Sequence, residues 1–218
     1  MTFLRDPEQL RSIQPDLVVE AAGRAAIDGW ATAALASGAT LIIASTSAFC
    51  DTKLLTDLTN TAKKFESRIL MAPGAVGGID ALVAAGVLQL DQVLHQIVKP
   101  PEAWKGTPAE RTLDLDTLDE RVVFFCGTAR QAADAYPQNA NATVVTSLAG
   151  IGLDETRVEL IADPFVKTNG HRIVAAGAFG NMEISLRNNP LCTNPKSSEL
   201  AALSLVRLIE QRTKYLVI

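Results

Sequence analysis

The sequence predicts an α/β protein in which a partial Rossmann domain, a doubly wound parallel sheet, precedes an α+β domain with a mixed sheet. Three observations indicate this. Apolar strand patterns alternate with helical patterns over residues 1–73, a glycine-rich segment follows at Gly74, and strand patterns dominate residues 74–194. Strands that alternate with helices are typical of right-handed βαβ units. We therefore expect an NAD(P)-binding domain over 1–73, on which a C-terminal helix at 195–213 packs, and a catalytic and dimerisation domain over 74–194.

The first domain is predicted as three parallel strands joined by two helices. A short helix precedes them, because Asp6 before Pro7 is a helix-start signal. The strands are runs of aliphatic residues suited to burial on both faces, and the helices carry apolar residues at helical spacing. The segments are a strand at 16–22, a helix at 25–37, a strand at 40–45, a helix that begins after Asp51 and a strand at 68–72.

Strands outnumber helices beyond residue 73. The predicted strands are 92–98, 121–125, 157–162, 172–178 and 182–186. The last three are expected to form an antiparallel meander, since 182–186 alternates apolar and polar residues as in a sheet with one solvated or partner-covered face. The run 142–149 fits either a helix or a strand, and Asn141 as a possible N-cap favours a helix. A final helix is expected to begin near Asn194.

Composition narrows the class of function. The chain has 218 residues, of which 48% are hydrophobic, and a net charge of −4, so it can bury a core but offers no basic stripe for nucleic acid. No apolar run approaches the roughly 20 residues that span a bilayer, and the first residues lack a signal-peptide pattern. We therefore expect a cytoplasmic protein with neither nucleic acid nor membrane as a partner. Cys50, Cys126 and Cys192 are odd in number and lack metal-ligand spacing, so buried reduced thiols and no metal site are expected.

The start of the chain lacks the usual signature of a dinucleotide-binding domain. Such a domain opens with a strand, a Gly-x-Gly-x-x-Gly turn and a helix whose N-terminus faces the pyrophosphate. Nothing before Asp16 matches this pattern, and the glycines of 74–78 follow the third strand with a different spacing. Two alternatives stand: the sequence is a truncated form of a larger protein, or the protein no longer binds a dinucleotide in the usual way.

Five separated motifs occur in the order in which one enzyme family carries them. They are Gly74-Ala-Val-Gly-Gly-Ile-Asp-Ala-Leu82, Lys99-Pro-Pro-Glu-Ala-Trp104, Gly127-x-Ala-Arg-x-Ala-Ala133 with Pro137-x-Asn-x-Asn141, Ala162-Asp-Pro with His171-x-Ile173, and Asn194-Pro-Lys-x-Ser198. Together they closely resemble L-aspartate dehydrogenase. The resemblance runs from about residue 16 to 213. Its departure is the glycine-rich first βα unit of that family, which has no counterpart here.

The resemblance implies an enzyme that transfers a hydride from the α-carbon of L-aspartate to NAD or NADP. The product, iminoaspartate, either hydrolyses to oxaloacetate and ammonia or feeds quinolinate and hence NAD synthesis. The resemblance also implies a homodimer formed through the second sheet. Residue by residue, His171 matches the catalytic histidine, Ala75 an alanine of the nicotinamide-side loop and Asn141 the nucleotide-binding asparagine.

The side chains suit these roles, and each also has a structural interpretation. His171 can take a proton from the substrate ammonium and later activate water, because histidine titrates near neutral pH; it can equally be a satisfied structural histidine. The glycines of 74–78 can admit a flat nicotinamide or simply form a turn. The amide of Asn141 can bind a carboxamide or ribose hydroxyl, cap a helix, or do both.

Further polar residues leave alternatives open. His95 lies inside a predicted strand with no acid or nucleophile beside it, so we interpret it as structural. Lys99, Arg130, Lys167 and Lys196 are candidates to bind the two substrate carboxylates, because a dianion needs cations or clustered donors. The competing function is a catalytically inactive homologue that serves as a dimerising or small-ligand-binding module. Chemistry like that of dihydrodipicolinate reductase matches the motifs less well.

Overall fold

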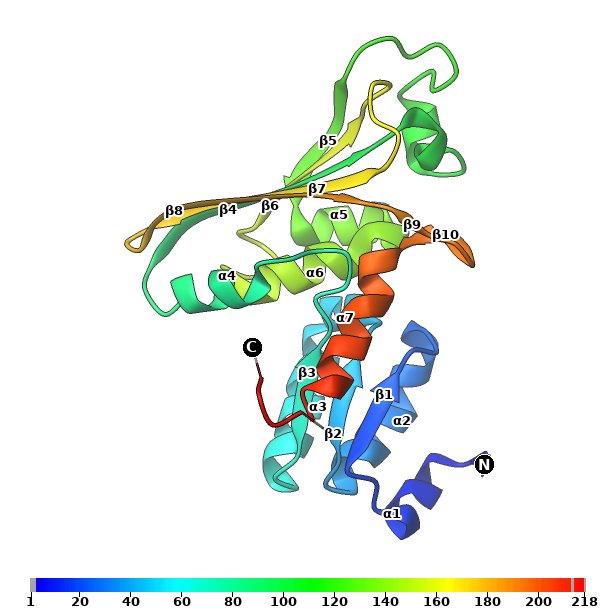
Figure 1. The fold of residues 1–218 in the computed structure, drawn as a ribbon, viewed down its shortest axis with the longest axis vertical. Coiled ribbons are helices and arrows are strands. Elements are labelled where there is room, and N and C mark those ends of the chain that lie inside the picture. Colours follow the sequence, from blue (N-terminus) through cyan, green and yellow to red (C-terminus); the bar gives the residue numbers. More distant parts are fainter. Residues whose placement is uncertain (1–2, 213, 218) are drawn as a thin grey trace. The chain divides into compact units, whose positions relative to one another are not determined.

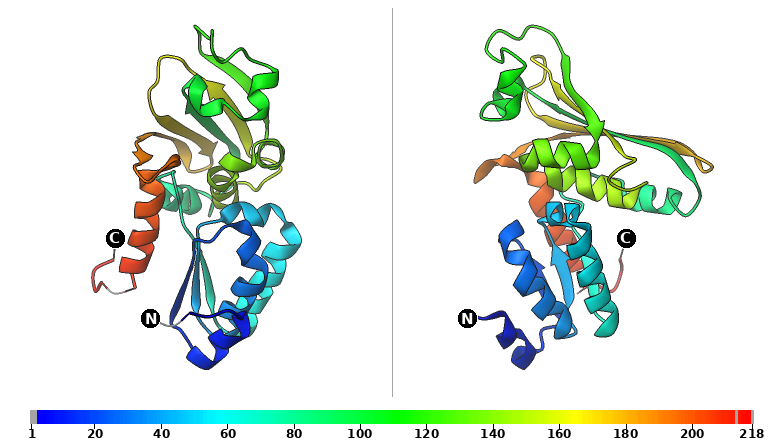
Figure 2. Two further views of the ribbon diagram at one scale, coloured as in Figure 1. Left: turned by 90° about the vertical axis from the view of Figure 1, so that its right-hand side faces the viewer. Right: turned by 180° about the vertical axis from the view of Figure 1, so that it is seen from behind.

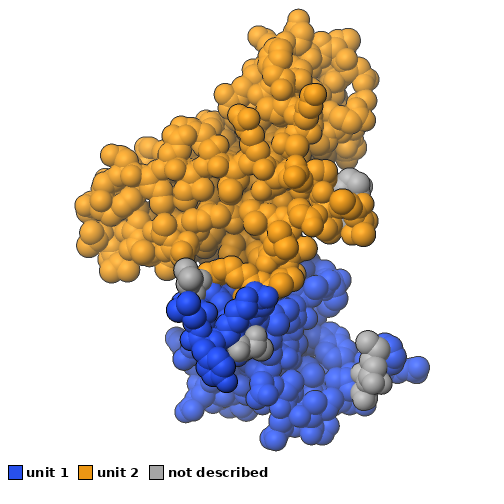
Figure 3. All heavy atoms as spheres, viewed as in Figure 1, with its two compact units in different colours: residues 1–72, 208–218 blue, residues 73–207 orange. Residues whose placement is uncertain are grey.

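The computed structural model describes residues 3–212 and 214–217, without the side chains of 138 and 194–196. The chain forms two compact units, coloured separately in Figure 3. Unit 1 comprises Met1–Ala72 and Leu208–Ile218, and unit 2 comprises Pro73–Arg207. Each unit contains its own sheet, so each is described by itself.

Unit 1 is built on a parallel sheet with the strand order β1-β2-β3. Its strands are β1 (Leu17–Glu20), β2 (Thr40–Ile43) and β3 (Arg68–Met71), linked by α2 (Ile27–Ala36) and α3 (Thr52–Lys64). Both helices cover the same face of the sheet, as Figure 2 shows, because two right-handed crossovers run in the same direction. The predicted βαβαβ order is confirmed. Shorter helices complete the unit: η1 (Pro7–Gln9), α1 (Leu10–Ile13), η2 (Arg24–Ala26) and η3 (Thr46–Cys50).

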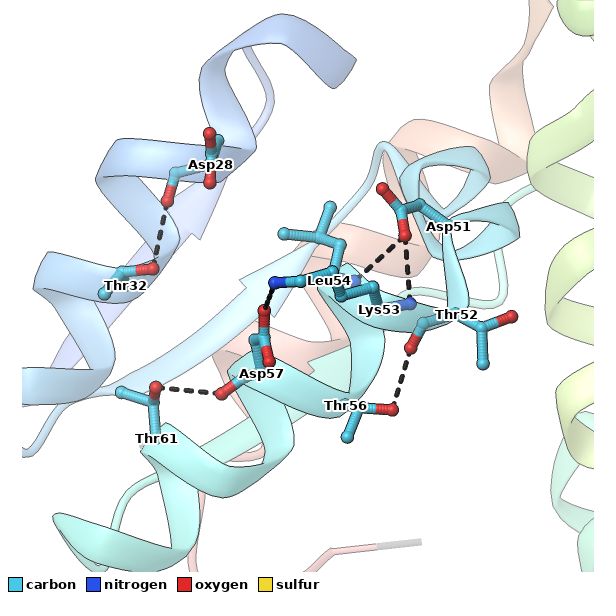
Figure 4. Close-up of polar contacts among 9 residues, drawn as sticks. All are labelled: Asp28, Thr32, Asp51, Thr52, Lys53, Leu54, Thr56, Asp57 and Thr61. Carbon is cyan, nitrogen blue, oxygen red and sulfur yellow. Dashed lines mark hydrogen bonds and ion pairs between the residues drawn. The ribbon is translucent and has the colours of Figure 1, made fainter.

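Local side-chain contacts fix the ends of these elements. The Asp51 carboxylate accepts hydrogen bonds from the backbone N–H groups of Lys53 and Leu54, at 2.9 and 3.1 Å, and so caps α3 as predicted (Figure 4). The Glu20 carboxylate accepts the N–H groups of Ala22 and Gly23 and both the N–H and the hydroxyl of Ser45. Glu20 therefore ties the carboxyl ends of β1 and β2 together. Only β2 is buried along its whole length, whereas β1 and β3 are partly exposed edge strands, contrary to the expected two-sided burial.

Unit 2 contains a five-stranded mixed sheet with the order β5-β6-β4-β7-β8. The strands are β4 (Leu90–Lys99), β5 (Val122–Thr128), β6 (Arg157–Ala162), β7 (Asn169–Gly177) and β8 (Gly180–Asn188). The predicted meander is wrong, because β4 lies between β6 and β7, parallel to the first and antiparallel to the second. Of the three strands of the predicted meander, β7 and β8 pair as a hairpin. Alternation along a strand indicates which face is buried but not which strand lies beside it.

Three helices cover one face of this sheet, as Figure 1 shows: α4 (Ile79–Ala85), α5 (Ala129–Ala135) and α6 (Ala140–Ala149). Val93, Ile173 and Ala175 of the sheet pack there against Leu82 and Val145 of the helices. The opposite face carries polar side chains. Short 3₁₀ helices lie in the connections: η4 (Pro101–Trp104), η5 (Pro108–Arg111) and η6 (Pro137–Asn139).

Two details differ from the sequence predictions. Asn139, not Asn141, occupies the N-cap position of α6, so Asn141 lies in the first helical turn. The last helix, α7 (Glu199–Glu210), begins later than predicted, because 194–198 forms strand β10 (Asn194–Ser198), paired with β9 (Pro190–Leu191). Proline is tolerated at a helix start and in an edge strand alike, so Pro195 did not distinguish the two.

The cysteines are free thiols, as predicted, but they are not buried. Cys126 and Cys192 are exposed and Cys50 is half-buried. Cys126 lies opposite Glu159 on the sheet face that the helices leave uncovered, which explains its exposure. Among residues 3–212 and 214–217, no helix combines the length and apolar character needed to cross a bilayer.

Candidate active site

His171 on β7 and His95 on β4 form a buried pair on neighbouring strands. Nε2 of His95 lies 3.0 Å from Nδ1 of His171, and the side chains are 0% and 7% exposed respectively. The interpretation that His95 has no proton-transferring group beside it is therefore wrong. The two residues are 76 positions apart, so only the unpredicted pairing of β4 with β7 brings them together.

Burial makes both imidazoles hard to protonate. Desolvation, and then the nearby ammonium of Lys99, lower the pKa of His171 to about 4. Desolvation, and then the neighbouring His171, hold the pKa of His95 well below its ordinary value. Both rings are therefore neutral at pH 7. His171 meets a substrate as an imidazole, with Nδ1 bonded to His95 and Nε2 left for the ligand.

Lys99 ends β4 as a cation whose charge no carboxylate of the described residues neutralises. Its Nζ donates to Oδ1 of Asn139 at 2.6 Å and lies 5.0 Å from the centre of the Trp104 ring. Trp104 is itself fixed, since its Nε1 donates to the carbonyl of Ile161 at 3.0 Å. Burial lowers the pKa of Lys99 to about 8, and no carboxylate in the described part of the chain lies within ion-pair distance of it. A carboxylate ligand would supply the missing charge.

The backbone of Ala75 is bonded to the end of β8, the strand that pairs with β7, on which His171 lies. Nδ2 of Asn188, at the end of β8, donates to the Ala75 carbonyl at 2.7 Å. Asn188 pairs in register with Asn169, two residues before His171 on β7. The backbone of Ala75 is thus tied to the same end of the sheet as His171. Sequence reasoning missed Asn188, for which no motif gave a signal.

Backbone conformation and packing explain why glycine occupies positions 74 and 78 beside Ala75. Gly74 and Gly78 have φ values of +68° and +67°, which disfavour other residues. A Cβ on Gly78 would lie 2.1 Å from Cδ1 of Ile184 on β8. These contacts support the turn interpretation for Gly78, whose missing side chain makes room for β8.

Asn141 lies in the helix whose N-cap position Asn139 occupies. It lies exposed in the first turn of α6, two residues after Asn139, whose side chain binds Lys99. Asn139 belongs to the same Pro137-x-Asn-x-Asn motif, so that motif contained a signal for both residues. Sequence reasoning assigned a role to only one of them.

The other cations that were candidates to bind the substrate carboxylates are Arg130, Lys167 and Lys196. The guanidinium of Arg130 pairs with both carboxylate oxygens of Asp154, at 2.6 and 2.8 Å. The side chain of Lys196 lies outside the described residues. Lys167 lines a cleft of about 630 Å³ in which Arg121, Arg172 and Arg187 also take part.

That cleft opens chiefly on the sheet face that the helices leave uncovered. Its lining includes alternate residues of β4, β7 and β8, namely Gln96, Val98, Gly170, Arg172, Ser185 and Arg187. Strand alternation turns these residues away from the face that carries the imidazoles of His95 and His171. His171 and Leu186 also line this cleft, so Lys167 shares it with His171, whereas Lys99 is the cation that lowers the pKa of His171.

Comparison with known proteins connects this site to an enzyme family. Residues 80–212 match the family model described as aspartate dehydrogenase, C-terminal, and residues 2–72 match that described as homoserine dehydrogenase, NAD binding domain. An L-aspartate dehydrogenase from Brucella anthropi is 51% identical over 216 residues, which are 99% of this chain and 81% of the relative. The chain belongs to the L-aspartate dehydrogenase family. It is accordingly related to oxidoreductases, and the first unit belongs with the NAD-binding domains of dehydrogenases.

Other aspartate dehydrogenases agree with this assignment. The enzyme from Polaromonas sp. is 46% identical, over 94% of this chain and 76% of its own length. The crystal structure of aspartate dehydrogenase from Thermotoga maritima superposes with a TM-score of 0.79 at 26% identity, covering 93% of this chain and 78% of that one. An archaeal homoserine dehydrogenase in complex with NADPH, at 11% identity and a TM-score of 0.59, shares the fold alone. The resemblance found in the sequence motifs and the predicted α/β class are both confirmed.

Proposed function

We propose that this protein catalyses the NAD(P)-dependent oxidative deamination of L-aspartate to iminoaspartate, which hydrolyses to oxaloacetate and ammonia. The observation that supports this most directly is the uncompensated ammonium of Lys99 close to the neutral imidazole of His171. A dicarboxylate bound to Lys99 would lie near a group able to exchange protons. Family membership supplies the reaction class, and the site supplies residues with suitable chemistry.

Each residue has a distinct part in the proposed reaction. Lys99, held by Asn139 and Trp104, binds one carboxylate of aspartate. His171 exchanges protons at Nε2 with the substrate nitrogen and with the attacking water, since its Nδ1 is bonded to His95. Ala75 and Asn141 contribute to the dinucleotide site. NAD or NADP bound there would supply the acceptor for the hydride of the α-carbon.

The test is aspartate-dependent formation of reduced nicotinamide, measured with NAD and with NADP separately. We expect His171→Ala to lower the rate by about 10²- to 10⁴-fold, the range for one acid–base group, with little change in dinucleotide affinity. Arg130→Ala is the matched control for a candidate cation, and it should leave the Michaelis constant for aspartate nearly unchanged because Arg130 already pairs with Asp154. An active protein indifferent to His171→Ala would exclude His171 as the catalytic residue. A folded protein that binds dinucleotide without oxidising aspartate would favour the inactive-homologue alternative.

We also propose a homodimer formed through the uncovered face of the second sheet. A row of hydrogen-bonded side chains crosses that face from β6 to β8, with Glu159 bonded to Gln96, Gln96 to Arg172, and Arg172 to Glu183. Such an ordered polar face is suited to another protein surface as well as to water. Sedimentation velocity should show a dimer that Arg172→Glu dissociates; a monomeric parent protein would contradict the proposal. A cytoplasmic role in NAD synthesis belongs to the same hypothesis, and loss of growth without external NAD precursors on deletion would support it.

A further inference from the structure

We infer that His95 is a positioning residue that fixes the tautomer of His171, so that the ring proton of His171 resides on Nε2. The inference rests on the proposed catalytic role of His171 for its functional meaning, but the tautomer itself follows from the buried pair. One hydrogen bond joins Nε2 of His95 to Nδ1 of His171 at 3.0 Å. Which ring donates that bond decides which nitrogen of each ring carries a proton.

Two neutral arrangements of the pair are possible. In the first, His95 donates from Nε2, its own Nδ1 carries only a lone pair, and the proton of His171 lies on Nε2. In the second, His171 donates from Nδ1, its Nε2 is a free lone pair, and the proton of His95 lies on Nδ1. The two arrangements therefore differ in what they place at Nδ1 of His95: a bare acceptor in the first and an N–H donor in the second.

The surroundings of His95 favour the first arrangement. Its Nδ1 is fully buried and has no hydrogen-bond partner in the part of the chain that the structure describes. In the sheet, His95 pairs with Val158 on one side and Ile173 on the other, and both side chains are apolar and buried. A buried N–H without an acceptor is rarer and less tolerated than an unused acceptor. His95 is therefore the donor, and His171 carries its proton on Nε2.

This tautomer determines how His171 first meets its ligand. It presents an N–H group at Nε2, which suits a carboxylate oxygen of the substrate better than its ammonium group. Before His171 can accept a proton at Nε2, both rings must move their protons to Nδ1, which places the N–H of His95 where no acceptor lies. His95 therefore sets the fraction of His171 that is ready to act as a base.

Nitrogen NMR tests the tautomer directly, because the chain contains only two histidines. In protein labelled with ¹⁵N-histidine at pH 7, long-range proton–nitrogen correlations should show both rings protonated at Nε2 and unprotonated at Nδ1. His95→Gln removes one ring and assigns the other. A ring protonated at Nδ1 would overturn the inference, and so would an imidazolium form of either ring.

Activity variants separate positioning from packing. A glutamine at position 95 can still donate to Nδ1 of His171 through its amide, whereas a leucine of similar volume cannot. We expect His95→Leu to lower kcat by roughly tenfold or more, because the base form of His171 carries a proton on Nδ1 that leucine cannot accept. His95→Gln, whose amide oxygen can accept that proton, should retain most of the activity. Val93→Ala, on the same strand and face, should lower stability without changing the tautomer of His171. Equal losses in His95→Gln and His95→Leu would overturn the positioning role.

The two experiments also distinguish this inference from the proposed function. Nε2-protonated rings in a protein without aspartate activity would uphold the tautomer and overturn the proposed reaction. Conversely, Nδ1-protonated rings in an active enzyme would uphold the reaction and overturn the role of His95.

Discussion

Replacing Lys99 by methionine keeps a side chain of similar length and removes its charge. Burial lowers the pKa of Lys99 from 10.5 to about 8, a difference of 2.5 units. At about 1.4 kcal/mol per pKa unit, the buried ammonium lowers the free energy of unfolding by roughly 3.5 kcal/mol at neutral pH. Methionine would relieve this cost but leave Oδ1 of Asn139 without its donor, a loss of about 1 kcal/mol. We therefore expect Lys99→Met to be more stable than the parent protein by about 2.5 kcal/mol at pH 7.

The stability gain of Lys99→Met should depend on pH, because the pKa of Lys99 differs between the folded and the unfolded protein. Between pH 8 and 10.5 the folded protein carries fewer protons on Lys99 than the unfolded chain does, because the folded pKa is the lower one. Stability contributed by this group therefore rises with pH through that window. Lys99→Met lacks the rise, so its advantage over the parent should be full at pH 7 and should shrink steadily above pH 8.

Urea unfolding at pH 7 and pH 9.5 measures both effects. Trp104 lies beside Lys99 in unit 2, so its fluorescence in a Trp30→Phe background reports on the correct unit. Lys105→Met is the control, since Lys105 is a surface lysine paired with Glu102 and Asp116, and its loss should give no gain in stability. A Lys99→Met protein that is less stable than its parent, by an amount independent of pH, would refute the reasoning. The same variant should weaken aspartate binding by about 10- to 100-fold, as expected for one charged hydrogen bond.

Three further predictions concern stability. Gly78→Ala should cost about 2 kcal/mol, because its Cβ would meet Cδ1 of Ile184 at 2.1 Å and its φ is positive; Ile184→Ala should recover part of the loss in the double mutant, and strictly additive effects would contradict this. Asp51→Ala should lower the free energy of unfolding of unit 1 by about 1 kcal/mol through loss of the helix cap, measured by urea unfolding. Glu20→Gln should cost about 1.5–3 kcal/mol, since an amide turns an N–H group toward the donors of Ser45, and an unchanged melting temperature would show that these bonds contribute nothing.

The sequence predicted correctly those elements whose apolar pattern and boundary signals lie within the element itself. The three strands and two helices of unit 1 were predictable because each carries its own apolar pattern and its own boundary signal, such as the Asp51 cap. The family was predictable because five motifs occur in order. The α6 helix was ambiguous in the sequence, and its cap was assigned two residues too late, because asparagine at 139 and at 141 carries the same signal.

Sequence reasoning failed where the partner of a strand decides the outcome. The order of the second sheet depends on β4 taking the centre, and alternation within a strand carries no information about its neighbours. For that reason the contact between His95 and His171 could not be foreseen, and His95 was interpreted as structural. The pKa of Lys99 and its unpaired charge depend on the packing of Trp104 and Asn139, which no local pattern encodes.

The central position of β4 also constrains the order of events during folding. Its neighbours β6 and β7 begin at Arg157 and Asn169, and contacts such as Gln96 with Glu159 close a loop of 63 residues. On the ribosome, β4 therefore emerges as a long strand with both edges unpaired until most of the unit has been synthesised. Non-local pairing of this kind slows folding and exposes strand edges to other chains. Unit 1, whose strands pair with the next strand along the chain, is expected to fold first and unit 2 to set the rate of refolding.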